Sequence, residues 1–146
     1  MAHCRAFLHT PGISVTRDAQ IACGAGRVHA MHDPTEGGLA TALHELAIAA
    51  EAMLEIDPAQ VPLYAETRRL CDYFGLEAWG VIASGSLLIA AAADDADRIV
   101  RALRSAGVEA GIIGRVGEKT PNPQVVSKAG ERLTRFDQDE IARLFQ

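Results

Sequence analysis

A chain of 146 residues is long enough to bury a hydrophobic core without disulfides or bound metals, so one ordinary domain is expected. Its formal net charge of −5, with Lys and Arg scattered along the chain, argues against a nucleic-acid-binding surface. No apolar run approaches the length of a membrane span, and the sequence after Met1 lacks the pattern of a signal peptide. We therefore expect a cytoplasmic protein that binds neither nucleic acid nor membrane.

The first part of the chain divides into an arm and the start of the domain. Residues 1–13 show no periodicity and are predicted to form a loose N-terminal arm, with a single domain over residues 14–146. Ser14–Ala25 has helical spacing and ends at glycines, and Val28–Met31 is predicted to be a short strand. The cysteines have no CxxC spacing, so we expect reduced thiols at Cys4, Cys23 and Cys71.

The next helix, which runs to Ala50, has strong start signals. Asp33 is a good N-cap, Pro34 suits the first helical position, and Glu36 stands where a capping-box carboxylate would reach back. Two glycines in a first turn weaken a helix, so the alternative is a start at Gly37–Gly38. Both starts remain open from the sequence.

The remaining elements alternate between strand and helix. We predict strands over Ala52–Ile56, Leu87–Ala92 and Glu109–Val116, helices over Ala65–Phe74 and, capped by Asp94, over Asp95–Ala106, a hairpin of Gln124–Lys128 with Glu131–Phe136, and a last helix capped by Asp137 with Glu140. Leu76–Ala83 is ambiguous, and Trp79 within it is predicted to be a packing anchor. The fold class is α+β, a mixed sheet covered by helices, with ferredoxin-like βαβ units accounting for part of the topology.

The glycine pair is the first candidate for chemistry. The unpaired N–H groups and the dipole of a helix start favour an anion such as phosphate, and glycine lets a ligand approach closely. The alternative is that Gly37 and Gly38 merely form a tight turn between strand and helix.

Other polar groups give weaker signals. His29, His32 and Asp33 form an HxxHD string, but alternate strand residues face opposite ways and no further ligand is close in sequence, so no metal site is predicted. The alternatives are a paired acidic site of Asp33, Glu36 and Glu45, or a capping role for Asp33 and Glu36. Ser84 and Ser86 match no nucleophile elbow, so hydrolase chemistry is not favoured.

Four stretches of the sequence resemble the C-terminal domain of the aminoimidazole ribonucleotide (AIR) synthase superfamily. They are MHDPTEGGLATALHELA at residues 31–47, LEIDPAQVPL at 54–63, ETRRLCDYFGLEAWGVIASGSLLIA at 66–90 and AGIIGRVGE at 110–118. The resemblance covers almost the whole chain beyond Gly12 and is strongest to the hydrogenase-maturation branch.

The resemblance implies an ATP-dependent function. Members activate an oxygen with ATP or transfer its phosphoryl group, and they work as two-domain subunits paired into dimers. Their N-terminal domain supplies most nucleotide and magnesium ligands, and their C-terminal domain closes the cleft. The residues that match the family's two glycine turns, and so imply a phosphate-side site, are Asp33, Pro34, Thr35, Gly37 and Gly38 in the first and Ala83, Ser84, Gly85 and Ser86 in the second.

The chain also departs from the family pattern. An N-terminal ATP-binding domain is not in this sequence, so we expect an inactive fragment that binds at most phosphate or sulfate, with ATP, Mg, homodimerisation and a small-molecule or protein substrate belonging to the intact protein. Hydrogenase-maturation members carry an Asn-Glu-Gly turn in place of Ala83–Gly85 and a terminal cysteine in place of Gln146. The alternative hypothesis is a non-catalytic module that dimerises through exposed sheet edges.

Overall fold

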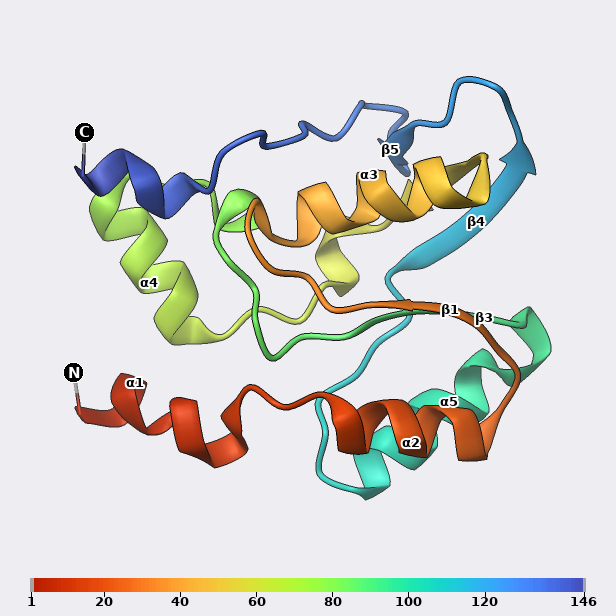
Figure 1. Ribbon diagram of the computed structural model, residues 1–146, viewed down its shortest axis with the longest axis horizontal. Coiled ribbons are helices and arrows are strands. Elements are labelled where there is room, and N and C mark those ends of the chain that lie inside the picture. Colours follow the sequence, from red (N-terminus) through yellow and green to blue (C-terminus); the bar gives the residue numbers. More distant parts are fainter. Residues whose placement is uncertain (1, 146) are drawn as a thin grey trace.

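The computed structural model describes residues 2–145 as helices packed on two small sheets (Figure 1). The helices are α1 (Ala2–Ala6), α2 (Thr16–Ala25), α3 (Gly38–Ala50), α4 (Ala65–Phe74) and α5 (Ala93–Ser105), and the strands are β1 (Val28–His32), β2 (Ala52–Ile56), β3 (Leu88–Ala91), β4 (Gly114–Lys119) and β5 (Val125–Ser127). The α+β class with a mixed sheet and covering helices is confirmed. No helix among residues 2–145 is long and apolar enough to cross a membrane.

The strands form one two-stranded and one three-stranded sheet. β1 pairs with β3 in antiparallel fashion, with His32 opposite Leu88 at one end of the ladder. In the second sheet β2 is central, antiparallel to β4 and parallel to β5. Because β1 and β2 belong to different sheets, α3 connects one sheet to the other.

Two separate clusters of buried side chains form the core. α3 packs over the three-stranded sheet, where Leu43, Leu54 and Val125 are almost completely buried. α2 and α5 lie together against the β1–β3 ladder, and their contact buries Ala22 and Leu103 (Figure 1). Removing a large aliphatic side chain of this kind from water stabilises the folded state by about 1.5–3 kcal/mol.

The strand over Ala52–Ile56 and the helix over Ala65–Phe74 form with the predicted bounds. Gly75 ends α4 in the left-handed conformation that favours glycine, with a φ of 65°. The helical spacing of Thr67, Leu70, Cys71 and Phe74 predicts that these residues form the inner side of α4. This prediction is wrong in part, because Leu70 and Phe74 are about half exposed and only Cys71 is buried. Burial raises the pKa of the Cys71 thiol, and the nearby charge of Asp72 adds to this.

Several predicted boundaries and caps are wrong. Ala92, not Asp94, is the N-cap of α5, and β4 lies at 114–119 instead of 109–116. The expected hairpin is reduced to the short strand β5 and one antiparallel bridge between Val126 and Arg132. The last helix is a 3₁₀ turn over Glu140–Phe145, and its cap is Asp139, whose carboxylate accepts the Ile141 N–H at 3.0 Å.

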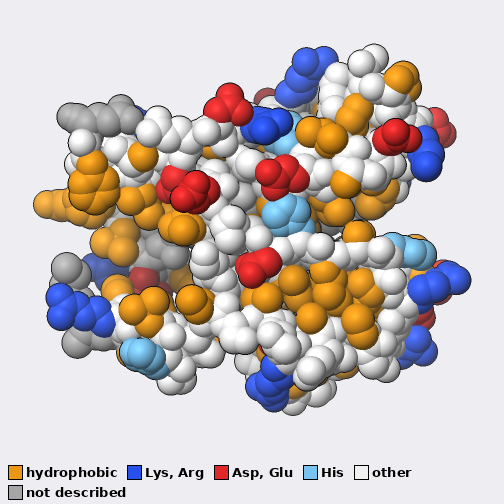
Figure 2. Space-filling view, viewed as in Figure 1, with side chains coloured by type: hydrophobic (Ala, Val, Ile, Leu, Met, Phe, Trp, Pro, Cys, Tyr) orange, Lys and Arg blue, Asp and Glu red, His pale blue; other side chains and the backbone are white. Residues whose placement is uncertain are grey.

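Hydrophobic side chains gather at one end of the molecule, over α1 and α4 (Figure 2). The exposed large side chains that belong to the segments of this end are Leu8, Ile13, Leu63, Tyr64, Leu70, Tyr73, Phe74, Leu144 and Phe145. Phe7, from the N-terminal arm, stacks on Tyr64 with ring centroids 5.1 Å apart. Exposed apolar area of this kind is typical of surfaces that contact further protein.

Candidate functional site

The start of α3 lies at the glycine pair. The helix begins at Gly38, and Gly37 is its N-cap in the left-handed conformation, with a φ of 73°. Asp33 and Glu36 are exposed, and no side chain of the preceding turn caps the helix. The predicted capping box is therefore wrong and the alternative start is confirmed, because the two left-handed glycines redirect the chain after the turn residues.

Both glycines are required by close internal packing. A Cβ on Gly37 would lie 2.5 Å from the Thr41 hydroxyl oxygen and 2.7 Å from the Phe136 carbonyl oxygen. A Cβ on Gly38 would meet the carbonyl oxygens of Trp79 and Val81, the latter at 2.5 Å. Close packing therefore explains why positions 37 and 38 are both glycine, which the sequence alone did not show. It supports the interpretation of these two residues as a tight turn.

The amide groups of the two glycines already have internal partners. The Gly37 N–H donates to the Asp139 carboxylate at 3.0 Å, and the Gly38 N–H donates to the Thr35 carbonyl at 3.1 Å. A carboxylate at a helix start is stabilised by the helix dipole in the same way as a phosphate. The anion nearest to this helix start is thus supplied by the chain itself.

The second glycine turn lies beside the first. The Ala83 N–H donates to the same Thr35 carbonyl at 3.3 Å, and the Ser86 N–H closes the turn on the Ala83 carbonyl at 3.0 Å. The two turns lie at the same end of the β1–β3 ladder: the first follows the end of β1, and the second precedes the start of β3. Gly85 has a φ of 97°. A Cβ at this position would lie 3.2 Å from the Cα of Ile13, at the end of the N-terminal arm.

The structure therefore brings the predicted site residues together in two layers. Pro34, Gly37 and Gly38 are buried. The exposed layer, which we call the candidate wall, consists of Asp33, Thr35, Ser84, Gly85 and Ser86.

The candidate wall carries hydroxyl groups and one carboxylate on an exposed surface. Its hydroxyl groups can donate to phosphate oxygens, and Asp33 offers the carboxylate oxygen that Mg²⁺ prefers. The wall itself contains no Lys or Arg. An anion would therefore bind here more readily with a cation that offsets the charges of Asp33 and Glu36.

The side chains of His32 and Glu45 are in hydrogen-bond contact beside the first turn. The His32 Nε2 and the Glu45 carboxylate oxygen are 2.6 Å apart, and within residues 2–145 the buried His32 Nδ1 has no partner. His29 is exposed on β1. Among residues 2–145, no three His, Cys, Asp or Glu side chains are grouped so that they could hold a metal ion.

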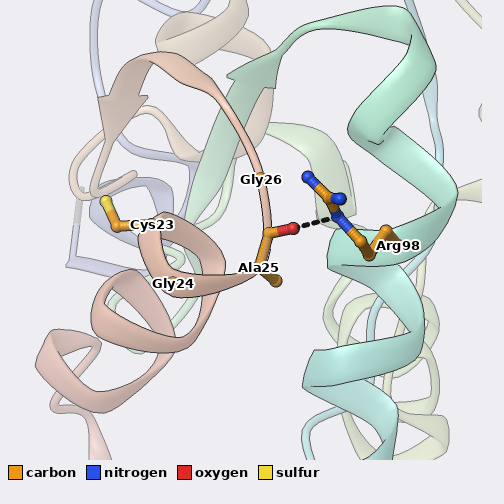
Figure 3. A pocket seen from close by; sticks show the side chains of 5 residues that line it. All are labelled: Cys23, Gly24, Ala25, Gly26 and Arg98. Atoms are coloured by element: carbon orange, nitrogen blue, oxygen red, sulfur yellow. Dashed lines mark hydrogen bonds between the residues drawn. The ribbon is translucent and has the colours of Figure 1, made fainter.

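Two surface hollows lie away from the candidate wall. The first, of about 400 Å³, is lined by Cys23, Gly24, Ala25, Gly26 and Arg98 (Figure 3). In it Arg98 reaches from α5 to donate to the Ala25 carbonyl at the end of α2, where a cation complements the helix dipole. The second, of about 510 Å³, lies between residues 59–62, α5 and residues 109–112. Neither hollow includes a predicted site residue.

Sequence reasoning missed the segment that covers the start of α3. Residues 133–140, which we call the C-terminal strap, supply Asp139 to Gly37 and the Phe136 backbone to Thr41. These contacts join residues about one hundred positions apart, and no local pattern signals them. Thr41, a polar residue in an apolar helix face, is the one hint that the sequence holds.

Comparison with protein families matches residues 13–125 to the model described as AIR synthase related protein, C-terminal domain. Among curated proteins, the carbamoyl dehydratase HypE of Rhizobium leguminosarum bv. viciae is 33% identical over 98 residues, covering 66% of this chain and 28% of that protein. HypE of Escherichia coli is 33% identical over 112 residues, covering 75% of this chain and 32% of that protein. The chain thus spans about a third or less of the length of these relatives.

Solved structures agree with this relationship. The crystal structure of E. coli HypE superposes with a TM-score of 0.74 at 28% identity, covering 89% of this chain and 41% of that chain. A structure of the hydrogenase maturation protein HypE in complex with ATP gives a TM-score of 0.73 at 25% identity, covering 88% of this chain and 42% of that chain. The sequence match and the shared fold agree: the chain belongs to the family of AIR synthase related C-terminal domains.

Proposed function

We propose that this chain is the C-terminal, cleft-closing domain of an ATP-dependent enzyme related to HypE, with the candidate wall on the phosphate side of the cleft. The observation that carries the proposal is the Thr35 carbonyl, which accepts N–H groups from both glycine turns and so holds them as one surface. The HypE structure that contains ATP supports a nucleotide as the ligand.

The wall residues would take different parts in binding. Thr35, Ser84 and Ser86 would donate hydroxyl hydrogen bonds to phosphate oxygens, and Asp33 would hold the magnesium ion that accompanies them. ATP would supply the phosphoryl group that activates an oxygen of a small-molecule or protein substrate. Pro34, Gly37 and Gly38 would support the first turn from within, because they are buried.

Activity would require a longer protein that includes this domain. The curated relatives are more than twice as long as this chain, and the family is named for its C-terminal domain. An N-terminal domain with the remaining ATP and magnesium ligands would complete the cleft, and the intact protein would form a homodimer. A HypE has also been solved in complex with HypF, which supports a protein partner for the intact enzyme.

A titration tests the role of the candidate wall. We expect Mg·ATP, added to the ¹⁵N-labelled chain, to shift the amide resonances of residues 33–38 and 83–86 with millimolar affinity. Replacing Ser84 and Ser86 by Ala should weaken binding several-fold, because two donors are lost. The matched control Ser105→Ala, at the exposed end of α5, should leave the affinity unchanged. Shifts confined to other surfaces would contradict the proposal, and inorganic phosphate alone would show whether the nucleoside contributes.

A second candidate is a non-catalytic module that dimerises through a sheet edge. The observation that favours it is β4, an edge strand whose six residues are all exposed. Such an edge can pair with a strand of a second copy. Light scattering with size-exclusion chromatography separates the candidates: a stable dimer that Val116→Lys disrupts would favour the module, whereas a monomer would favour the first proposal.

A further inference from the structure

The C-terminal strap is bonded along one face of α3. The Leu133 carbonyl accepts the His44 Nε2–H at 3.0 Å. The Thr41 hydroxyl donates to the Phe136 carbonyl at 2.9 Å and accepts the Phe136 N–H at 3.3 Å. One turn earlier, Asp139 accepts the Gly37 N–H at 3.0 Å. The bonded positions of α3 are thus spaced by four and three residues, which places them on one side of the helix.

The same strap is bonded to the segment that leads into the second turn. The buried Glu140 carboxylate accepts the Glu77 N–H at 2.9 Å and pairs with Arg143 at 2.7 Å. The Glu77 N–H lowers the pKa of Glu140 below its usual value, so the carboxylate stays ionised. The Phe136 ring lies against Gly80, where a Cβ would approach the ring to 2.5 Å. The strap therefore contacts both segments that carry the candidate wall.

A short series of hydrogen bonds connects Asp139 to the junction of the two turns. Asp139 holds the N–H of Gly37, and the adjoining Gly38 N–H donates to the Thr35 carbonyl. That carbonyl also accepts the Ala83 N–H of the second turn. Asp139 is thus linked through Gly37 and Gly38 to the Thr35 carbonyl and so to Ala83.

We propose that Asp139 is a positioning residue for the candidate wall: through Gly37 it fixes the Thr35 carbonyl that joins the two turns. The inference rests on the proposed function, because positioning matters only if the wall binds a ligand. A hydrogen bond to an ionised carboxylate in a partly buried place is stronger than one between neutral groups. Asp139 is distinguished from an ordinary cap because its two oxygens have separate partners, Oδ1 on Ile141 and Oδ2 on Gly37.

Amide hydrogen exchange of four variants tests the positioning. In Asp139→Ala we expect the Gly37 and Ala83 amides to exchange at least tenfold faster, relative to the Leu103 amide in the second core cluster, because the bond that holds the first turn is lost. Asp139→Asn, which keeps an acceptor, should restore most of the protection. Asp139→Ser, whose shorter side chain keeps the Ile141 cap but falls short of Gly37, should not restore it. Asp137→Ala, at an exposed acidic neighbour in the same strap, should match the wild type.

Three results would overturn the inference. If Ala83 exchange is unchanged in Asp139→Ala, or if Asp139→Ser restores protection, Asp139 is only a local cap of the last turn. Mg·ATP titration of the same variants supplies the second readout, with affinity expected to fall several-fold in Asp139→Ala and to return in Asp139→Asn; faster exchange with unchanged affinity would also overturn it. Absence of ATP binding by the wild type, with the expected exchange pattern, would instead overturn the proposed function and leave Asp139 as a determinant of turn geometry.

Discussion

The two glycine turns that meet at Thr35 use glycine for different physical reasons. In the first turn Gly38 is buried, and backbone carbonyls occupy the space where a side chain would begin. In the second turn Gly85 is exposed. Apart from its chain neighbours, the atom nearest to the position that a Cβ would take is the Ile13 Cα, at 3.2 Å. The comparison shows that a glycine-rich turn in a ligand-binding family is not by itself evidence that a ligand approaches the glycine.

The largest expected effect is that of Gly38→Ala. The left-handed conformation costs an alanine about 1–2 kcal/mol, and the clash with two backbone carbonyls adds about 1–3 kcal/mol of overpacking. We expect the free energy of unfolding, measured by urea denaturation, to fall by about 3 kcal/mol or more.

Gly75→Ala is the matched control for this variant. Gly75 has nearly the same φ, 65° against 64°, but apart from its chain neighbours and its own helix nothing lies within 4 Å of the position that a Cβ would take. It should lose only the conformational part, about 1–2 kcal/mol. Equal losses in the two variants would mean that the carbonyls around Gly38 move away readily, and the close-packing explanation of the first turn would be wrong.

Gly85→Ala should have an intermediate effect. Its φ of 97° strains an alanine, whereas the single tight contact with Ile13 can relax because the N-terminal arm is exposed there. We expect a loss of about 1–2 kcal/mol, close to that of Gly107→Ala, which has a similar φ and open surroundings. A loss as large as that of Gly38→Ala would show that the second turn is packed as rigidly as the first.

The smallest expected effect is a pH dependence contributed by Glu140. Its pKa is lowered in the folded protein, chiefly by the Glu77 N–H, so it binds a proton less readily when folded than when unfolded. Its stabilisation is therefore complete above its unfolded pKa, about 4.3, and is lost as the pH falls through the lower folded value. Denaturation at pH 7, 5, 4 and 3 should show a stability loss that is reduced in Glu140→Gln.

Two other carboxylates calibrate this measurement. Asp57, whose pKa a hydrogen bond from Lys128 also lowers, should maintain part of the slope in Glu140→Gln. Glu131→Gln, at an exposed residue, should keep the wild-type slope. If Glu140→Gln also keeps the full slope, the strap is not anchored through an ionised Glu140.

Local sequence signals predicted some regular elements with the right bounds, and contacts between distant segments explain why the start of α3 was left open. Ala52–Ile56 alternates apolar and other residues, and Gly75 follows a periodic segment, so β2 and the end of α4 were predictable from neighbours alone. The local capping signals of Asp33 and Glu36 are as clear as those that predicted β2 and the end of α4. The helix nevertheless starts later, at Gly38, because Gly37 and Gly38 pack against Trp79, Val81 and Phe136. No short window of sequence contains that information.

The candidate wall was predictable only through the family resemblance. Ser84 and Ser86 have no spacing signal of their own, and matching the family's second turn placed them with Thr35. Their adjacency in the structure agrees with that placement, whereas their part in binding stays a prediction. Asp139 was beyond reach because sequence spacing pointed to Asp137 as the helix cap.

The strap also has a consequence for the order in which the chain can fold during synthesis. Gly37, Thr41 and His44 leave the ribosome about ninety to one hundred residues before Asp139, Phe136 and Leu133, their hydrogen-bond partners. Until the strap emerges, the start of α3 has polar groups without partners, and each one left unpaired in a buried place costs about 1–3 kcal/mol. A nascent chain that stops before residue 133 should therefore be more sensitive to proteolysis around residues 33–44 than the full chain, whatever the state of its second core cluster.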